Sequence, residues 1–518
     1  MYKRRISLLI YILLFWVSSA VAQPKTLPEL RSKIAEVLAK PELSSAMVGI
    51  KVVSLDNGRV LFEENATKLL RPASNMKLYT VAAALDRLSP DYRFSTSVYA
   101  YTRPDAAGVV HGNLTIYGRG DPSIAARFNN GDYFKGVDDL AARIVAAGVK
   151  RVEGDIVGDE SYFVGPKYGS GWNWEDLTWY YGAEITPLAA NDNALDLFIK
   201  PGSAIGQPAL ITTGPPDPLL TIVNNVTTAA KGSKREFLIH RGLGENTITI
   251  TGSIPLEDRG YTGSIGISHP ALLFVYMLRS SLAQKGVTIT GASKTRGATP
   301  QRLAITGVTI SGTNGSSASP FQNEIATLQS PPFSVIAAQT LKPSQNLYTE
   351  LILRTLGKVS PPPATSTSNL PQTSDELGLE AVKSFLKTVG IRPEALVLDD
   401  GSGLSRNDMI TAEASVQLLT FMSKHRYATV FRDALPIGGV DGTLRNRFKG
   451  TPAENNVRAK TGSLSSAASL GGYMTTAGGE KLAFSIMVNN YPRDLDPRSS
   501  CIDPIAVLLA SFAGKATD

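Results

Sequence analysis

Ser74 and Lys77 stand three positions apart, just after Pro72 and at the start of an alanine- and leucine-rich stretch. Because proline is favoured at the first positions of a helix, we expect a helix to begin here, with Ser74 in its first turn. Residues three apart share a helix face, so the Lys77 amine can reach the Ser74 hydroxyl. A neutral lysine can take the proton that keeps a serine unreactive. The pair therefore predicts nucleophilic catalysis. The free backbone N–H groups of the first helical turn can donate hydrogen bonds to the oxyanion that forms in such a reaction.

The same spacing occurs a second time, at Ser384 and Lys387. Chance alone produces a Ser-x-x-Lys pair about twice in 500 residues of ordinary composition. The second pair lies within an amphipathic pattern that continues to Gly390 and has no helix-start signal. We therefore interpret it as structural.

Ser344 and Asn346 carry a hydroxyl and an amide that such chemistry also uses. They follow Pro343 and open an amphipathic pattern that runs to Leu356. Placed over the nucleophile, the two groups can relay a proton and hold a substrate amide. The alternative is that Ser344 only caps the helix.

Lys460, Thr461 and Gly462 form a third motif, which chance produces only about 0.1 times in a chain of this length. Gly462 lets a substrate backbone pass close to the strand and pair as an added edge strand. Lys460 brings a second positive charge near Lys77, and like charge together with burial lowers the pKa of a lysine. Lys460 and Thr461 can also bind a carboxylate.

In the order S-x-x-K, S-x-N, K-T-G, the motifs match the active-serine penicillin-recognising set. The chain resembles the low-molecular-mass class C penicillin-binding proteins, which are D-alanyl-D-alanine carboxypeptidases/endopeptidases. Two departures are Gln345, where the set has Asp, and Thr349, where family members often carry Ala. Neither position is assigned to proton transfer. The strings that carry the resemblance span nearly the whole mature chain: residues 71–77 (RPASNMK), 118–122 (GRGDP), 400–405 (DGSGLS), 435–443 (LPIGGVDGT) and 459–464 (AKTGSL).

The resemblance implies a two-step acyl transfer in which Ser74 attacks the carbonyl of the penultimate D-Ala and Lys77 takes its proton. Ser344, with Lys77 and Lys460 nearby, returns a proton to the leaving amine, and Asn346 holds the acyl side. Water then hydrolyses the acyl-enzyme. Penicillin, which mimics the D-Ala-D-Ala terminus, is expected to acylate the same serine. No cofactor and no metal are implied.

The resemblance also implies the binding groups around these residues. The backbone N–H groups of Ser74 and Ser463 form the oxyanion hole, and the terminal carboxylate of the substrate contacts Lys460, Thr461 and Ser463. Asp159 lies in a string similar to a family segment where an acidic group faces the free amine of the stem peptide. A turn or surface carboxylate is the alternative interpretation of Asp159.

The two ends of the chain predict the element framework of one domain. Residues 28–41 have the period of an amphipathic helix, and residues 503–513 predict a closing helix. Hairpin signals occur at both ends, at residues 47–62 around Asp-Asn-Gly and at residues 469–489 around Ala-Gly-Gly. We therefore expect an α/β (α+β) domain whose antiparallel sheet is covered by helices, of the β-lactamase/transpeptidase-like type that the resemblance implies.

The middle of the chain, about residues 95–325, contains many short β-like runs separated by glycine and proline. Two similar units, residues 140–149 and 278–287, each consist of a helix and a glycine and are each followed by a strand, which indicates one interrupted module. Family members nest two further domains between their first two motifs, and Ser74 and Ser344 are 270 positions apart. We predict a catalytic domain of residues 23–95 plus 326–518, an inserted β-rich domain of residues 96–185 plus 270–325, and a domain of residues 186–269 nested within it.

Residues 1–22 have the three parts of a secretory signal peptide: a basic start, an apolar run and a small-x-small end at Ala20–Ala22. The apolar run of about twelve residues is shorter than the ~20 that span a bilayer. An uncleaved anchor is the alternative. We expect an exported protein of the bacterial periplasm, at most loosely associated with the membrane, which acts on peptidoglycan stem peptides and binds β-lactams covalently.

Composition excludes several other classes. The chain has 518 residues, of which 43% are hydrophobic, so global disorder is excluded. Its single cysteine, Cys501, cannot form an intramolecular disulfide, and we expect it to be buried. Four histidines leave little for a metal site, and the net charge of +7 contains no basic block that indicates nucleic acid. The three mature tryptophans, at positions 172, 174 and 179, predict a local hydrophobic cluster, with sugar stacking as the alternative.

The sequence disfavours three rival functions. A Ser-His-Asp hydrolase is disfavoured because the sequence has no Gly-x-Ser-x-Gly elbow. A β-lactamase-like hydrolase shares the three motifs, but the long insertion is foreign to those compact enzymes. A non-catalytic exported wall-binding protein is expected to have lost the nucleophile or the base, and both are present.

Overall fold

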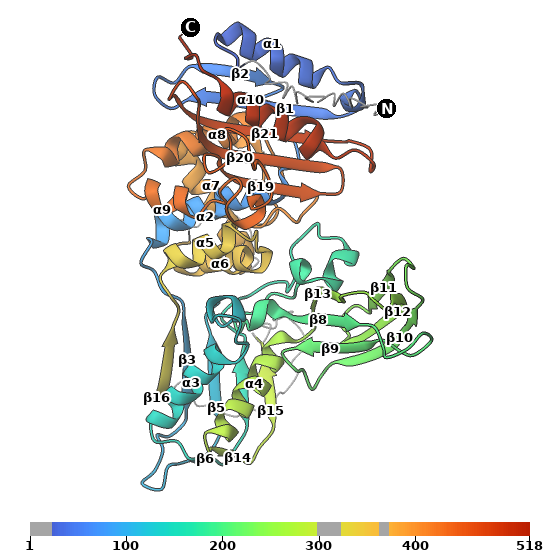
Figure 1. Cartoon of the computed structure of the whole chain (residues 1–518). Helices are drawn as coiled ribbons and strands as arrows, with labels where there is room; N and C mark the ends of the chain where they lie inside the picture. The colour runs from blue at the N-terminus through green and yellow to red at the C-terminus, as the bar shows by residue number, and fades with distance from the viewer. Residues whose placement is uncertain (1–22, 298–322, 362–371, 518) are drawn as a thin grey trace, which may run out of the picture.

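The computed structural model describes residues 23–297, 323–361 and 372–517. It consists of three bodies (Figure 1): a large body at the top, a second body at the bottom, and a lateral body at the right. The second body is called the middle body here, because its chain segments come from the middle of the sequence. The predicted signal peptide, residues 1–22, lies outside the described residues. No helix in the described ranges is both long and apolar enough to cross a membrane.

A five-stranded antiparallel sheet, in the order β19-β20-β21-β1-β2, forms the centre of the large body. The two ends of the chain meet in it, because β1 pairs with β21 along its whole length. The predicted antiparallel sheet built from both ends is therefore confirmed. Its strands are β1 (Met47–Ser54), β2 (Val60–Glu64), β19 (Arg458–Leu464), β20 (Ala467–Thr475) and β21 (Lys481–Asn489).

Helices cover both faces of this sheet, because successive side chains of a strand point to opposite faces. In β21, Phe484 and Ile486 pack with α1 (Leu27–Leu38) and α10 (Asp503–Ser511), whereas Met487 packs with the helices of the other face. The helices on that other side of the sheet are α2 (Met76–Leu88), α5 (Phe333–Leu341), α6 (Asn346–Val359), α7 (Ser374–Val389), α8 (Ala412–Ser423) and α9 (Ala428–Asp433). A short pair, β17 (Leu396–Val397) and β18 (Met409–Ile410), completes the large body.

The middle body contains a five-stranded sheet, β15-β7-β5-β3-β16, and a small one, β14-β6-β4. Its first and last strands, β3 and β16, pair antiparallel, so the chain enters and leaves side by side (Figure 1). The two helix-Gly-strand units also lie together, since β6 pairs with β14 and β7 with β15. The elements are β3 (Ser95–Ala100), β4 (Val109–Val110), β5 (Leu114–Gly118), α3 (Lys135–Ala146), β6 (Arg151–Val152), β7 (Ile156–Asp159), α4 (Pro270–Gln284), β14 (Thr288–Ile289), β15 (Ser293–Arg296) and β16 (Asn323–Gln329).

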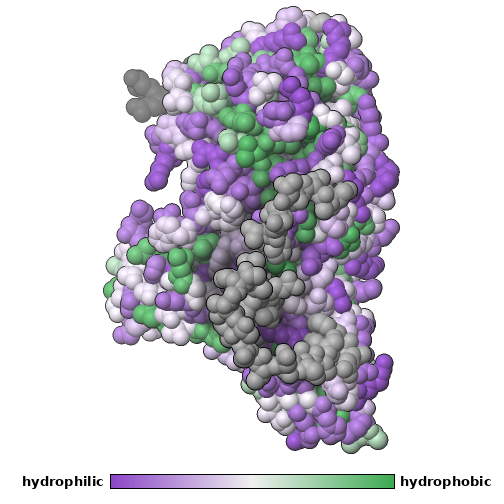
Figure 2. Space-filling view, turned by 180° about the vertical axis from the view of Figure 1, so that it is seen from behind, coloured by the Kyte–Doolittle hydropathy of each residue, from purple (hydrophilic) through white to green (hydrophobic). Residues whose placement is uncertain are grey.

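The lateral body is built from two three-stranded sheets, β13-β8-β9 and β10-β12-β11. Seen from behind, it forms a lobe at the left of Figure 2, with a notch between it and the large body. Its strands are β8 (Ala194–Lys200), β9 (Leu210–Gly214), β10 (Thr221–Ala229), β11 (Glu236–Arg241), β12 (Thr247–Pro255) and β13 (Tyr261–Gly266).

The predicted tryptophan cluster is wrong. Trp174 is 60% exposed, whereas Trp179 packs against the apolar core of the middle and lateral bodies. Trp172 packs beside a third apolar group and donates a hydrogen bond to Asp400 at 2.8 Å. The three indoles, close in sequence, thus point into different surroundings. The prediction for Cys501 is confirmed: it is buried, and burial raises the pKa of its thiol to about 12.

Candidate active site

Ser74 lies in a 3-10 turn, Ala73–Asn75, that leads directly into α2. The helix that was predicted from Pro72 thus begins with this tighter turn. Ala73 has a φ of +48°, a left-handed conformation that a non-glycine residue seldom adopts and that is often found beside functional groups. Lys77 follows in the first turn of α2, and its Nζ lies 3.0 Å from the Ser74 Oγ.

The Lys77 side chain is completely buried. Its Nζ lies 2.5 Å from the Asn346 Oδ1 and 2.7 Å from the Ser402 carbonyl oxygen. Burial lowers the pKa of Lys77 to about 7, although the charges of three carboxylates, those of Asp400, Glu350 and Asp408, act in the opposite direction. Near neutral pH a substantial fraction of Lys77 is therefore unprotonated and able to accept a proton.

Ser344 and Lys460 form the second polar pair of the site. The Lys460 Nζ lies 2.8 Å from the Ser344 Oγ and 2.9 Å from the Thr461 carbonyl oxygen. Ser344 itself has a φ of +67° and precedes α6, whose N-cap residue is Gln345. The alternative that Ser344 caps the helix is therefore wrong.

Burial, and then the charge of Lys77, hold the pKa of Lys460 well below its usual value. The sequence predicted that like charge and burial together lower the pKa of Lys77. Burial is the largest cause of the lowered pKa, and the charge of Lys460 is not among its causes. Both amines are driven toward the neutral form chiefly because each is enclosed by protein.

The strand that carries the K-T-G motif, β19, is an edge strand of the central sheet. On its outer side the Ala459 N–H donates to the Pro436 carbonyl at 3.0 Å. Because successive residues of a strand direct their backbone groups to opposite edges, Thr461 and Ser463 face the same outer edge as Ala459. The strand thus presents backbone donors and acceptors to an extended chain laid beside it.

The backbone groups of Gly462 are directed away from this outer edge, toward β20. The structure also shows why this position has no side chain. A Cβ atom here would lie 2.1 Å from the Ser469 Oγ and 2.4 Å from the Pro72 carbonyl oxygen. The Ser469 hydroxyl donates to that same carbonyl at 2.6 Å. Gly462 therefore makes room for the turn that carries Ser74, and its role in admitting a substrate backbone stays a prediction.

A tight loop around the Asp400 carboxylate places the Ser402 carbonyl against Lys77. The carboxylate accepts hydrogen bonds from the backbone N–H groups of Ser402, Gly403 and Ser405, at 2.5–2.9 Å, and the Trp172 indole donates to it as well. The Glu350 Oε1 accepts from the Gly401 N–H at 3.0 Å. Acidic groups of α6 and of the loop thus hold the backbone that contacts the lysine.

A pocket of about 370 Å³ opens over these groups. One of its walls comes from the segment before the lateral body, since the Asn346 Nδ2 donates to the Tyr181 carbonyl at 2.8 Å. The lining residues are Ser74, Asp176, Tyr180, Tyr181, Pro343, Ser344, Asn346, Gly403, Leu404, Arg406, Thr443, Thr461, Ser463, Leu464 and Ser465. Residues of all three sequence motifs, the first two of which are 270 positions apart, thus line one cavity.

Asp159 is not brought to this pocket. Its buried carboxylate forms an ion pair with Arg296 on the neighbouring strand β15, with 2.8 Å between the Arg296 Nε and the Asp159 Oδ2. Oδ1 accepts from the Ser161 N–H at 2.8 Å. A role for Asp159 in binding an amine remains a prediction.

Sequence reasoning assigned no role to Ser402, Tyr181 or Thr443. Ser402 and Tyr181 act through backbone carbonyls, and Thr443 accepts a hydrogen bond from the Thr461 hydroxyl at 2.8 Å. A signal for two of them was present, because Ser402 and Thr443 lie in the strings at residues 400–405 and 435–443. Nothing in the local sequence of Tyr181 indicated its position.

The geometry defines a class of protein. A serine hydroxyl in contact with a buried lysine amine of lowered pKa has the geometry of a nucleophile with its base, and a second serine is in contact with a second lysine. Among the residues that the structure describes, no group of histidine, cysteine, aspartate and glutamate side chains could hold a metal ion. The fold and the site are those of an active-serine acyl-transfer enzyme of the penicillin-recognising type.

Comparisons with known proteins place the chain within that class. The model of the D-Ala-D-Ala carboxypeptidase 3 (S13) family matches residues 30–302 and 296–512. The D-alanyl-D-alanine carboxypeptidase of Actinomadura sp. (strain R39) is 33% identical over 508 residues, which cover 96% of this chain and 87% of that protein. DacB of Haemophilus influenzae is 27% identical over 459 residues, 86% of this chain and 85% of that protein. The chain belongs to the S13 family of serine-type D-Ala-D-Ala carboxypeptidases.

The fold agrees with a solved structure. Penicillin binding protein 4 (dacB) from Haemophilus influenzae superposes with a TM-score of 0.75 at 23% identity, over 95% of this chain and 100% of that one. A second structure of the same protein, complexed with a β-lactam, has a TM-score of 0.67 at 21% identity, over 92% and 98% of the two chains. The predicted fold class is confirmed.

The close packing at Gly462 yields a first testable prediction. In Gly462→Ala, the new methyl group forces the Pro72 carbonyl and the Ser469 hydroxyl apart, and overpacking of this kind costs about 1–3 kcal/mol. We expect a lower melting temperature and slower acylation of Ser74 by penicillin, although Gly462 does not line the pocket. Stopped-flow acylation and thermal unfolding measure the two effects.

Gly471→Ala on the adjacent strand β20 is the matched control, because the nearest atom to its new Cβ is 3.6 Å away. It should change both quantities much less. Equal effects of the two substitutions on acylation would contradict the assignment of Gly462 to the Ser74 turn.

Proposed function

We propose that this chain is an exported serine DD-peptidase that hydrolyses the terminal D-Ala-D-Ala bond of peptidoglycan stem peptides, their D-Ala-diamino-acid cross-links, or both. The observation that carries the proposal is the 3.0 Å contact between the buried Lys77 amine and the Ser74 hydroxyl. The contact lies at a pocket that an edge strand borders, and an extended peptide can pair with such a strand.

Acylation begins with neutral Lys77. As the Ser74 Oγ attacks the carbonyl carbon of the penultimate D-Ala, its proton passes to the Lys77 Nζ. The Oγ–C bond forms, and the carbonyl oxygen becomes an oxyanion, which accepts hydrogen bonds from the N–H groups of Ser74 and Ser463. The helix that starts after Ser74 adds the favourable field of its N-terminus.

Collapse of this intermediate breaks the C–N bond. The leaving amine takes a proton from the Ser344 hydroxyl, and the proton that Lys77 accepted from Ser74 replaces it, so Lys77 is neutral again. The Lys460 Nζ, 2.8 Å from the Ser344 Oγ, holds that hydroxyl in place. Asn346 holds the acyl side of the substrate, and Lys460, Thr461 and Ser463 hold its terminal carboxylate. In the second step neutral Lys77 takes a proton from the attacking water molecule, the ester bond to the Ser74 Oγ breaks, and Lys77 returns that proton to the Oγ.

A β-lactam presents the same carbonyl in a strained ring, and we propose that it forms a covalent adduct on Ser74. The relatives support this step. Penicillin binding protein 4 from Haemophilus influenzae has been solved with a β-lactam. A relative from Dictyostelium discoideum, 27% identical over 480 residues, which are 87% of this chain and 84% of that protein, is named a penicillin-sensitive carboxypeptidase A.

We further propose that residues 1–22 are a cleaved signal peptide and that the mature chain works in the bacterial periplasm, without a transmembrane anchor. The basic, apolar and small-residue parts of this segment support export. The domain borders stay as predicted, with residues 96–185 plus 270–325 and residues 186–269 as nested insertions. The pairing of β3 with β16, where the chain enters and leaves the middle body, supports such a nesting.

The proposal is tested with the full mature chain. After incubation with penicillin and protease digestion, mass spectrometry should find the adduct on the peptide that contains Ser74. Incubation with muropeptides should release D-Ala, split cross-linked dimers, or both, which measures the two activities separately. Rapid turnover of penicillin would favour a β-lactamase-like hydrolase, and a chain without any adduct would be a non-catalytic wall-binding protein.

The pKa of Lys77 predicts the pH profile of acylation. Below about pH 7 the amine is protonated and cannot accept the Ser74 proton, so the acylation rate should fall by about tenfold per pH unit. Above pH 7 the rate should level off. Stopped-flow acylation by penicillin between pH 5 and pH 9 measures the profile, with circular dichroism as a control for folding.

Asp400→Asn supplies a second arm of this test, because the Asp400 charge raises the pKa of Lys77. The acid limb should move to lower pH in this variant. Loss of loop structure alone would slow the reaction without moving the limb. A rate independent of pH in the wild type would contradict the role of Lys77 as the base.

A further inference from the structure

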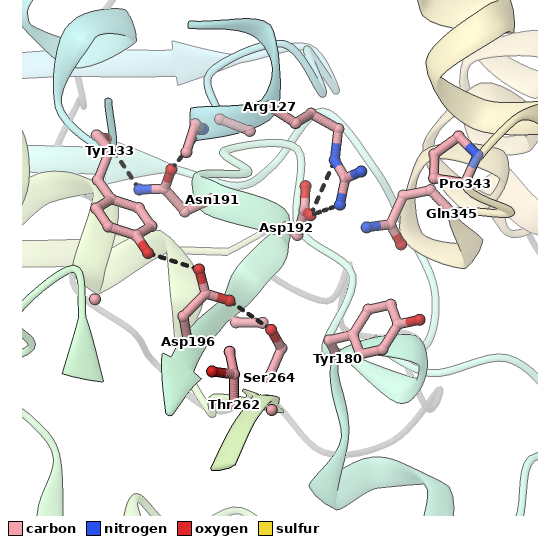
Figure 3. Close-up of a pocket in the computed structure, with 15 residues that line it drawn as sticks. Arg127, Tyr133, Tyr180, Asn191, Asp192, Asp196, Thr262, Ser264, Pro343 and Gln345 are labelled. Atoms are coloured by element: carbon pink, nitrogen blue, oxygen red, sulfur yellow. Dashed lines mark hydrogen bonds and ion pairs between the residues drawn. The ribbon is translucent and has the colours of Figure 1, made fainter. Parts of the chain in front are cut away.

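A second pocket, of about 540 Å³, lies beside the catalytic pocket, and Tyr180 and Pro343 line both. Figure 3 shows its walls. Arg127 and Tyr133 come from the middle body, Asp196 from strand β8 of the lateral body, and Gln345 from the segment before α6. A volume of this order falls within the roughly 300–1,000 Å³ that is usual for ligand sites.

Gln345 is the first feature of this pocket that points to a ligand. Its side chain is 1% exposed, and neither polar atom of its amide has a hydrogen-bond partner among the described residues. Figure 3 shows the amide directed toward the space between Arg127 and Tyr180. A buried amide without partners is unfavourable, and because it offers one donor side and one acceptor side, another amide complements it best.

Asp196 is the second feature. It accepts hydrogen bonds from the hydroxyls of Tyr133, at 2.6 Å, and Ser264, at 2.5 Å, and neither donor carries a charge. No ion pair of Asp196 occurs in the part of the chain that the structure describes, whereas the other carboxylate of the pocket, Asp192, is paired with Arg127. The Asp196 wall of the pocket therefore attracts groups that donate hydrogen bonds.

We propose that this pocket is a subsite for the part of a peptidoglycan fragment that extends past Tyr180 and Pro343 from the catalytic pocket. Gln345 pairs with a secondary amide of the fragment, and Asp196 accepts from an N–H or O–H group of it. The amide belongs either to the stem peptide or to the acetamido group of an attached sugar. Tyr180 is 37% exposed, so its side chain can turn to admit the fragment. The inference rests on the proposed function.

A ligand in the second pocket can affect catalysis, because Gln345 is bonded directly to two residues of the catalytic pocket. Gln345 lies between Ser344, whose hydroxyl contacts Lys460, and Asn346, whose amide oxygen contacts Lys77. Its backbone is held by a hydrogen bond to the Thr340 carbonyl at 2.9 Å. A ligand that fixes the Gln345 side chain therefore also fixes the segment that carries the second motif.

The test uses a fragment that has no D-Ala-D-Ala bond, the N-acetylglucosaminyl-N-acetylmuramyl tripeptide. Isothermal titration calorimetry measures its binding to the full chain whose Ser74 carries penicillin, and to Ser74→Ala. With the catalytic serine blocked, we expect saturable binding. Gln345→Met and Asp196→Asn should each weaken it by about tenfold, the usual effect of one lost hydrogen bond.

Asp217→Asn is the matched control, since Asp217 lies in the same stretch of chain as the lateral body but lines neither pocket. It should bind the fragment as the wild type does. Gln345→Met removes an unpartnered amide, so its melting temperature should not fall, which separates a binding role from a structural one. The disaccharide alone and the tripeptide alone distinguish the acetamido source of the amide from the peptide source.

Absence of saturable binding to both blocked forms would overturn the proposal, as would binding that neither substitution weakens. If the proposed DD-peptidase function is wrong, a different result is expected, namely no penicillin adduct on Ser74. In that case binding to Ser74→Ala still decides whether the second pocket takes the fragment.

Discussion

Replacing Ser74 with alanine is expected to abolish covalent labelling by penicillin and all release of D-Ala from muropeptides. The Ser74 hydroxyl lies 3.0 Å from the Lys77 amine and lines the catalytic pocket, and the substitution removes the only atom that forms the acyl ester. The side chain is small, so the fold should persist. Fluorescent penicillin, followed by denaturing electrophoresis, measures the adduct directly.

Ser384→Ala is the matched control, because Ser384 has the same spacing to a lysine, Lys387. It lies inside α7, and its hydroxyl contacts Arg87 at 3.5 Å rather than a buried amine. Labelling should be unchanged in this variant. Labelling that survives Ser74→Ala and disappears in Ser384→Ala would overturn the assignment of the nucleophile.

Replacing Lys77 with methionine is expected to slow acylation by about 10²–10⁴-fold, the usual contribution of a general base. Methionine has a similar length but cannot accept a proton. It also removes the contacts of the amine with Asn346 and Ser402. Because these two oxygens lose their donor in the buried site, we also expect a lower melting temperature, and circular dichroism checks that the variant is folded. Single-turnover kinetics with penicillin measure the rate.

The corresponding control is Lys387→Met, which alters the lysine of the second Ser-x-x-Lys pair. Its acylation rate should equal that of the wild type. If Lys77→Met acylated within tenfold of the wild-type rate, another group would have to be the base, and Lys460 would be the first to examine.

The pairing of Ser74 with Lys77 could be predicted from the sequence because their motif is local. Three positions along a helix bring Ser74 and Lys77 together whatever the rest of the chain does. The central sheet was predictable for a similar reason, since both of its hairpins have short-range turn signals. The meeting of Lys77 with Asn346, 269 positions away, followed only from the resemblance to a family.

The remaining features depend on contacts that no local pattern encodes. The carbonyls of Ser402 and Tyr181 are backbone groups, which every residue type supplies, so their role has no sequence signature. The close approach of Gly462 to the Pro72 carbonyl could not be predicted, because that contact depends on how the turn packs on the sheet. Trp172 and Trp174 are two positions apart, yet one contacts Asp400 and the other is exposed to solvent.

The contact between Trp172 and Asp400 has a consequence for anyone who wishes to shorten this protein. The Asp400 carboxylate organises the loop that presents Ser402 to the base, and one of its five hydrogen bonds comes from the long segment between β3 and β16. The same segment supplies the Tyr181 carbonyl that orients Asn346. A variant that lacks this segment would keep all three sequence motifs but lose the hydrogen bonds from Trp172 and Tyr181, and we expect it to be inactive.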